Sequence, residues 1–161
     1  MSASHGGRRV TVVVDLGCAN YGSQDSVAAL IDAYHPGQLY AFDPNPVLRQ
    51  GERNRKGTSV RYRRIAAWLY DGEIGYLEDI TRSHIVDGAQ PVACFDFSAW
   101  LKTLGCHVIL KMDVEGAEYE LLERMIADGT DQLVDELLVE WHDDDHGLTE
   151  RLACPVKQWW M

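Results

Sequence analysis

The chain has 161 residues, enough for one domain that buries about 70% of the surface of its unfolded chain. Its apolar fraction of 46% is that of a globular protein, and no apolar run approaches the roughly 20 residues that span a bilayer. The net charge of −10 argues against a nucleic-acid-binding domain, which is normally basic.

Composition also suggests the domain limits and the compartment. Residues 1–8 are small and polar, which predicts a flexible N-terminal tail, and residues 9–161 are expected to form a single domain. The four cysteines have no paired spacing and no signal-peptide core follows Met1, which together favour reduced thiols in a cytoplasmic protein. Basic residues concentrate between Arg49 and Arg64, where they form a solvated surface or attract an anionic substrate.

Strands and helices are expected to alternate along the chain. Continuous apolar or β-branched runs predict strands over 10–15 and 107–110, and further strands are expected over 39–42, 60–67 and 133–141. Helices are expected from Asp25 or Ser26 to Tyr34 and over 47–53, 97–104, 118–126 and 148–160. A hairpin is expected to join 66–69 to 74–77, with 80–90 as a loop. This alternation predicts one α/β domain with a largely parallel sheet.

A glycine loop follows the first predicted strand. The segment from Val12 to Gly22 reads VVVDLGCANYG, and Gly17 suits a tight turn that lets a ligand approach the backbone. Asp15, at the end of the strand, suits a ligand that carries an amino group. Asp43 ends the next strand 26 residues after Gly17, where an acid can accept both hydroxyls of a ribose.

The segment 110–122, LKMDVEGAEYELL, joins a buried strand to a helix. It puts acids at the carboxyl edge of the predicted sheet, where open α/β sheets bind ligands. This segment and the sequence YAFDPNP around Asp43 resemble the FkbM family of S-adenosylmethionine-dependent methyltransferases, whose signature strand closes in K-x-D-x-E-G-x-E. The resemblance covers about residues 10–142.

The resemblance implies a Rossmann-like, doubly wound domain with strand order 3-2-1-4-5 and S-adenosyl-L-methionine as cofactor. The last two strands of the usual methyltransferase sheet are expected to be missing, and one residue is expected to be inserted in the glycine loop. The resemblance implies cofactor contacts at three places. The glycine loop would hold the methionine part with Asp15, Gly17, Ala19, Asn20 and Gly22. The end of the second strand would hold the ribose with Asp43 and Pro44, and Ala67 and Trp68 after the third strand would flank the adenine.

Candidate catalytic residues lie at the ends of the fourth and fifth predicted strands. Histidine titrates near neutral pH, so His142 is expected to accept a hydroxyl proton, with Asp113 as the alternative if its pKa is raised. Glu115 is a further candidate, although Glu115 and Glu118 can equally stabilise the start of the helix. The consecutive acids at 143–145 are expected to form a solvated loop, not a cation site. No metal site is assigned, and the use of a divalent metal at Asp113, Glu140 and His142 is left open.

The predicted function is methyl transfer to a hydroxyl of a small molecule or sugar. Two alternatives stay open, an NAD-binding oxidoreductase, which Asp43 would also serve, and a cofactor-binding module without catalysis. No nucleic-acid or membrane partner is expected. A fifth strand left at the sheet margin would be strongly apolar, which predicts a homodimer or a terminal segment that caps it.

Overall fold

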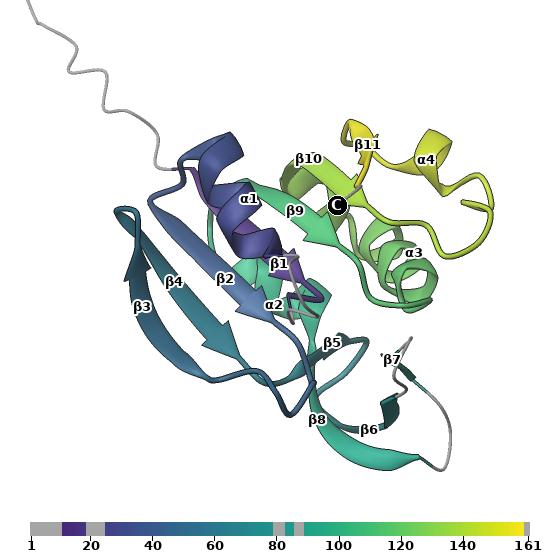
Figure 1. Ribbon diagram of the computed structural model, residues 1–161. Helices are drawn as coiled ribbons and strands as arrows, with labels where there is room; N and C mark the ends of the chain where they lie inside the picture. The colour runs from purple at the N-terminus through teal and green to yellow at the C-terminus, as the bar shows by residue number, and fades with distance from the viewer. Residues whose placement is uncertain (1–10, 19–24, 79–82, 86–88, 160–161) are drawn as a thin grey trace, which may run out of the picture.

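A seven-stranded sheet runs through the protein, whose computed structural model describes residues 11–18, 25–78, 83–85 and 89–159 (Figure 1). All neighbouring strands in this sheet are parallel except the last pair, which is antiparallel. The chain therefore has an α/β fold with a mostly parallel central sheet, as the sequence predicts. Across the sheet the strands are β11 (Val156–Gln158), β10 (Val134–Val139), β9 (Val108–Met112), β1 (Val12–Leu16), β2 (Gln38–Phe42), β4 (Thr58–Arg63) and β3 (Gly51–Arg55).

Helices cover both faces of the central sheet (Figure 1). Successive residues of a strand point to opposite faces, and Val13 packs with α1 (Ser26–Tyr34) while Val14 packs with α2 (Phe97–Thr103) and α3 (Glu118–Asp128). The first two helices begin where the sequence predicts, because the side chains of Asp25 and Asp96 accept backbone N–H groups of the first turn. Two short helices follow, η1 (Thr130–Leu133) and α4 (Leu148–Arg151).

A second sheet of four strands has the order β5 (Ala66–Trp68), β8 (Gln90–Asp96), β6 (Gly72–Glu78) and β7 (Ser83–Ile85). Strand β8 pairs with both β5 and β6 and separates them, so the expected hairpin between these two segments is wrong. The hairpin is instead formed by β6 and β7, which places a short strand within the expected loop at 80–90.

The strand order of the central sheet differs from 3-2-1-4-5 because two unexpected strands flank it. The five expected strands occur as β4, β2, β1, β9 and β10, with β3 added at one edge and β11 at the other. Strand β3 occupies a segment expected to be helical. Lys56 and Gly57 both have positive φ, 51° and 86°, and form the two-residue turn that joins β3 to β4.

Strand β11 occupies the other segment that was expected to be helical. The helix ends at Arg151, and after Pro155 the chain is extended and pairs parallel with β10. This pairing covers the apolar strand β10 within the same chain, which is the capping by a terminal segment that the sequence offered as one of two possibilities. The homodimer stays a prediction, but an uncovered β10 no longer argues for it. Among the described residues, no helix is both long and apolar enough to cross a membrane.

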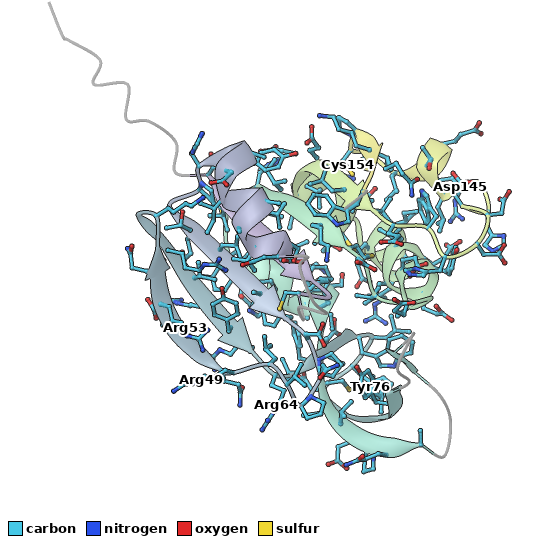
Figure 2. All side chains as sticks on the ribbon, viewed as in Figure 1. Arg49, Arg53, Arg64, Tyr76, Asp145 and Cys154 are labelled. Carbon is cyan, nitrogen blue, oxygen red and sulfur yellow. The ribbon has the colours of Figure 1, made fainter. Side chains whose placement is uncertain are left out.

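The basic segment lies along the hairpin of β3 and β4. Figure 2 shows Arg49, Arg53 and Arg64 on this side of the molecule, away from Asp145. The guanidinium of Arg53 lies 4.7 Å from the centre of a tyrosine ring in β4, and other cations of the segment are held in ion pairs with acids of α1 and β3. Part of this charge therefore stabilises the hairpin, while its expected attraction for an anionic substrate stays a prediction.

Candidate functional site

Four adjacent strands end at the same level on the carboxyl edge of the central sheet. Leu16 in β1 is in register with Phe42 in β2 and with Met112 in β9, and Met112 is in register with Val139 in β10. The residues that follow these four strand ends therefore lie next to one another. We call them the edge row, which consists, in order, of Asp43, Gly17, Asp113 and Glu140.

Backbone hydrogen bonds continue through the edge row. Each N–H donates to the carbonyl oxygen of the last residue of the neighbouring strand. Gly17 donates to Phe42 at 2.9 Å, Asp113 to Leu16 at 3.1 Å, and Glu140 to Met112 at 3.0 Å. The row is therefore a continuation of the sheet, and its members are fixed relative to one another. Three of its four residues are acidic.

Gly17 is required by the close packing of β1 and β9. Its φ is +80°, and a Cβ atom built on it would lie 1.7 Å from the carbonyl oxygen of Asp113. No side chain fits at this distance. The sequence indicates a glycine for a tight turn and a ligand, whereas in the structure the glycine is needed first for the contact between two strand ends.

Lys111 and Asp15 form a buried ion pair beneath the turn at Gly17, which we call the glycine turn. Lys111 Nζ lies 3.0 Å from Asp15 Oδ1 and donates hydrogen bonds to the carbonyl oxygens of Leu16, at 3.3 Å, and Gly17, at 2.7 Å. Asp15 Oδ2 accepts a 2.6 Å hydrogen bond from Ser26 Oγ in α1. Burial alone would lower the pKa of Lys111, but the nearby carboxylates of Asp15 and Asp113 outweigh it and raise that pKa.

This arrangement changes the expected role of Asp15. Its side chain is completely buried and is bound to Lys111 and Ser26, so a direct contact with the amino group of a cofactor does not fit. Sequence reasoning missed Lys111, although a lysine within the otherwise apolar strand β9 was a usable signal. We infer that both residues hold the glycine turn in place.

The other expected cofactor residues lie at two places. Asp43 is buried at the end of β2, where its Oδ1 accepts the backbone N–H of Asn45 at 2.8 Å, and Pro44 next to it is half-buried. Ala67 is buried in the main core and Trp68 packs against that core from β5. The remaining three residues of the expected set lie outside the described residues: Ala19, Asn20 and Gly22.

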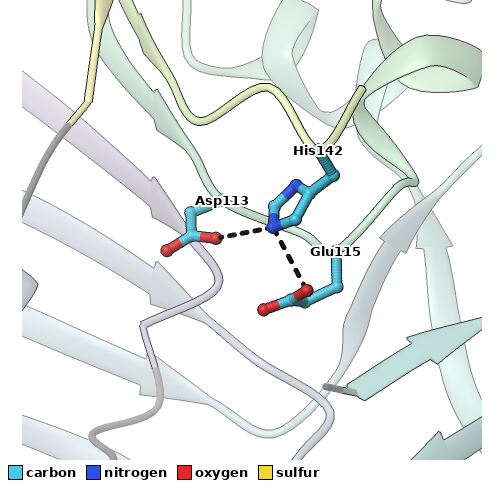
Figure 3. Close-up of side chains that lie close together, drawn as sticks. All are labelled: Asp113, Glu115 and His142. Atoms are coloured by element: carbon cyan, nitrogen blue, oxygen red, sulfur yellow. Dashed lines mark ion pairs between the residues drawn. The ribbon is translucent and has the colours of Figure 1, made fainter. Parts of the chain in front are cut away.

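Asp113, Glu115 and His142 meet at the β10 end of the edge row (Figure 3). His142 Nε2 lies 3.1 Å from Glu115 Oε2 and 3.7 Å from Asp113 Oδ1. On the other side of the ring, Nδ1 lies 3.0 Å from Oε1 of Glu118, which also accepts the backbone N–H of His142 at 3.1 Å. We call these four residues the His142 cluster. The sequence predicts the meeting of Asp113 and Glu115 with His142, and their catalytic roles stay predictions.

The environment of the cluster shifts the pKa values of its members. Hydrogen bonds to Glu115 and Glu118 raise the pKa of His142 to about 10. Burial raises the pKa of Asp113 to about 6, although the charge of Lys111 opposes this shift. Burial would also raise the pKa of Glu118, but the hydrogen bond from His142 and further backbone hydrogen bonds lower it.

These shifts bear on the two candidate bases in opposite ways. The pKa of His142, raised to about 10, favours the protonated imidazole at neutral pH and so weighs against its expected role as a proton acceptor, which stays a prediction. Asp113 was expected to accept the hydroxyl proton only if its pKa were raised, and its pKa is raised to about 6. Sequence reasoning missed the contact of Glu118 with the imidazole, because it treated this acid only as part of a helix start.

The consecutive acids at 143–145 form a turn. Their side chains accept backbone N–H groups of the same segment, from Asp144, His146 and Gly147, at 2.8 to 3.0 Å. This use of the carboxylates in an exposed turn agrees with the expected solvated loop.

Comparison of the chain with protein-family models gave no match, and neither did comparison with curated proteins or with solved structures. The case for a function therefore depends on the sequence segments described above and on the geometry of the edge row.

Proposed function

We propose that the protein is an S-adenosylmethionine-dependent methyltransferase that acts on a hydroxyl oxygen of a small molecule or sugar. The observation that carries this proposal is the edge row, which gathers residues from four separate chain segments. The row lies where the chain reverses direction across the sheet, since β1 is followed by β2 on one side and later by β9 on the other. Open α/β sheets bind ligands at such a point. On this proposal the fold is Rossmann-like.

The chemistry of the row suits this cofactor. S-adenosylmethionine would supply a methyl group on a positively charged sulfur, and the carboxylates of Asp43, Asp113 and Glu140 favour a cationic ligand. Asp43, at the end of β2, is the residue that we assign to the ribose hydroxyls. The contact with the methionine part of the cofactor is assigned to the backbone of the glycine turn. Asp15 does not make this contact, because its side chain is buried.

The acceptor hydroxyl is assigned to the side of the row where Asp113 adjoins the His142 cluster. Methyl transfer requires the hydroxyl oxygen in line with the bond between sulfur and the methyl carbon, so positioning is the main task of the protein. Asp113 is the carboxylate next to the glycine turn, and we assign to it the orientation of the hydroxyl.

A thermal-shift experiment with S-adenosylhomocysteine tests the cofactor assignment. The ligand is expected to raise the Tm of the wild-type protein, because it binds only the folded state. Asp43→Asn keeps an oxygen for the backbone N–H of Asn45 while it removes the charge and replaces the second accepting oxygen by an NH₂ group. We expect this variant to lose about 1.5–3 kcal/mol of binding free energy, the range for hydrogen bonds to a charged group, which is roughly a 10- to 150-fold weaker Kd.

Asp32→Asn is the matched control, since Asp32 is an exposed acid of α1 paired with Lys56. It is expected to leave binding unchanged. Unchanged binding by Asp43→Asn would remove Asp43 from the ribose site, and absence of any shift in the wild-type protein would contradict the proposed cofactor.

A further inference from the structure

Three side chains with metal-binding atoms converge in the His142 cluster. One ligand atom each from Asp113, Glu115 and His142 lie within 4.8 Å of one another, and within the described ranges this is the only such group of three. Figure 3 shows the two carboxylates on the same side of the imidazole, facing Nε2. The ligands come from two segments, the loop after β9 and the end of β10.

The distances within the group fit a common ion. Donor atoms bound at about 2.1 Å are about 3.0 Å apart at adjacent octahedral positions and about 3.4 Å apart at tetrahedral positions. Nε2 lies 3.1 Å from Glu115 Oε2 and 3.7 Å from Asp113 Oδ1. The oxygens of Asp113 and Glu115 lie within 4.8 Å of each other, so both carboxylates face the same nitrogen and would complete a three-ligand site by moving toward each other.

The second nitrogen of the imidazole is held as in metal-binding histidines. Such residues usually donate their other N–H to a carboxylate or carbonyl, which fixes the ring and leaves one nitrogen for the metal. Glu118 does this for Nδ1 of His142 at 3.0 Å, and its side chain is completely buried. Its other oxygen accepts the backbone N–H of Gly116 at 2.8 Å. The start of α3 therefore aims Nε2 at Asp113 and Glu115.

The side chains around the group carry more negative than positive charge. Four carboxylates lie here, three in the cluster and Glu140 beside Asp113 in the edge row. Lys111 is the nearby lysine, but its closest carboxylate is Asp15 at 3.0 Å, with Asp113 at 3.7 Å. An ion with two positive charges would offset this excess better than a single proton on the imidazole.

We propose that Asp113, Glu115 and His142 bind a divalent transition-metal ion, with positions left open on the ion for water or a substrate oxygen. Imidazole together with carboxylates favours ions such as Mn²⁺ over Mg²⁺, which prefers oxygen ligands alone. The part of such an ion in catalysis rests on the proposed methyl transfer, where it would bind the acceptor hydroxyl. Its binding does not rest on that proposal and can be measured alone.

Mn²⁺ is the probe for the experiment, because its binding is followed both by calorimetry and by the loss of the free-ion paramagnetic resonance signal. The full chain is treated with a chelator, exchanged into metal-free buffer and titrated with Mn²⁺ and, separately, Mg²⁺. We expect one Mn²⁺ per chain, bound more tightly than Mg²⁺. Glu115→Gln and Asp113→Asn should each weaken Mn²⁺ binding at least tenfold.

His107→Ala is the matched control. His107 Nδ1 lies 3.0 Å from Asp135 Oδ1, so this variant removes another pair of histidine and carboxylate, located before the start of β9 rather than after its end. It is expected to bind Mn²⁺ like the wild type. Glu115 is about a third exposed, so the glutamine variant should fold, which circular dichroism and the Tm without metal would verify.

Two results would overturn the proposal. The first is no saturable Mn²⁺ binding by the wild-type protein, which would leave His142 as a protonated partner in an ion-pair network. The second is unchanged Mn²⁺ binding in both carboxamide variants, which would place the ion elsewhere. If the wild-type protein binds S-adenosylhomocysteine but not Mn²⁺, only the metal site is overturned, and if it binds Mn²⁺ but not S-adenosylhomocysteine, only the cofactor assignment is overturned.

Discussion

Gly17→Ala is expected to destabilise the protein by more than about 4 kcal/mol, at the damaging end of the range for single substitutions. The added Cβ would lie 1.7 Å from the carbonyl oxygen of Asp113, so β1 and β9 would have to separate at the edge row. In a chain of 161 residues this corresponds to a fall in Tm of roughly 10 °C or more, measured by differential scanning calorimetry.

Gly57→Ala is the control, because it measures the cost of placing alanine at a positive φ without a steric clash. Gly57 has a similar φ of +86°, but nothing lies within 4 Å of the position of its Cβ. Its loss should be about 1–2 kcal/mol, the cost of a left-handed conformation for a residue with a side chain. Equal losses for the two alanine variants would show that β1 and β9 do not approach as closely as described.

Lys111→Met is expected to cost about 3–5 kcal/mol of unfolding free energy, because removing one partner of a buried ion pair leaves the other charge uncompensated. Asp15 would keep its hydrogen bond from Ser26 but lose its cation. The carbonyl oxygen of Gly17 would lose the lysine as a donor, while that of Leu16 would keep the backbone N–H of Asp113. Urea denaturation of the variant would measure the loss.

A double-mutant cycle with Asp15→Asn tests this explanation. Asparagine keeps an acceptor for Ser26 and removes the buried charge. The double variant should be more stable than Lys111→Met alone, by about 1–2 kcal/mol, because the unpaired charge is gone. If the losses of the two single substitutions simply add, the two side chains do not form the buried pair.

Four of the five strands that the sequence predicted are rich in apolar residues. Burial on both faces of a parallel sheet leaves this pattern in the sequence, which is why β1, β2, β9 and β10 were found. Strand β3 has no such pattern, because its residues Gly51–Arg55 are almost all exposed and are held by pairing with β4. Neither strand of this hairpin buries a continuous apolar run, so the pairing left no apolar pattern at β3, although its turn at Lys56 and Gly57 follows directly in the sequence.

The candidate site was predictable in position but not in detail. Acids at strand ends of a parallel sheet share an edge, so the proximity of Asp113 and His142 followed from the order of the strands. The shifted pKa of His142 did not follow, because it depends on the contact with Glu118, the last residue of the motif, which was considered only for the start of the helix. The buried ion pair of Asp15 and Lys111 was also not predicted, because the two residues lie on different strands and far apart in the sequence.

The binding of an S-adenosyl ligand at the edge row is measured most directly by calorimetric titration of the wild-type protein. S-adenosylhomocysteine and NAD⁺ would be titrated in parallel, since an acid at the end of β2 suits the ribose of either ligand. We expect saturable binding of one S-adenosylhomocysteine per chain and much weaker binding of NAD⁺. Saturable binding of NAD⁺ without binding of S-adenosylhomocysteine would contradict the proposed methyltransferase function.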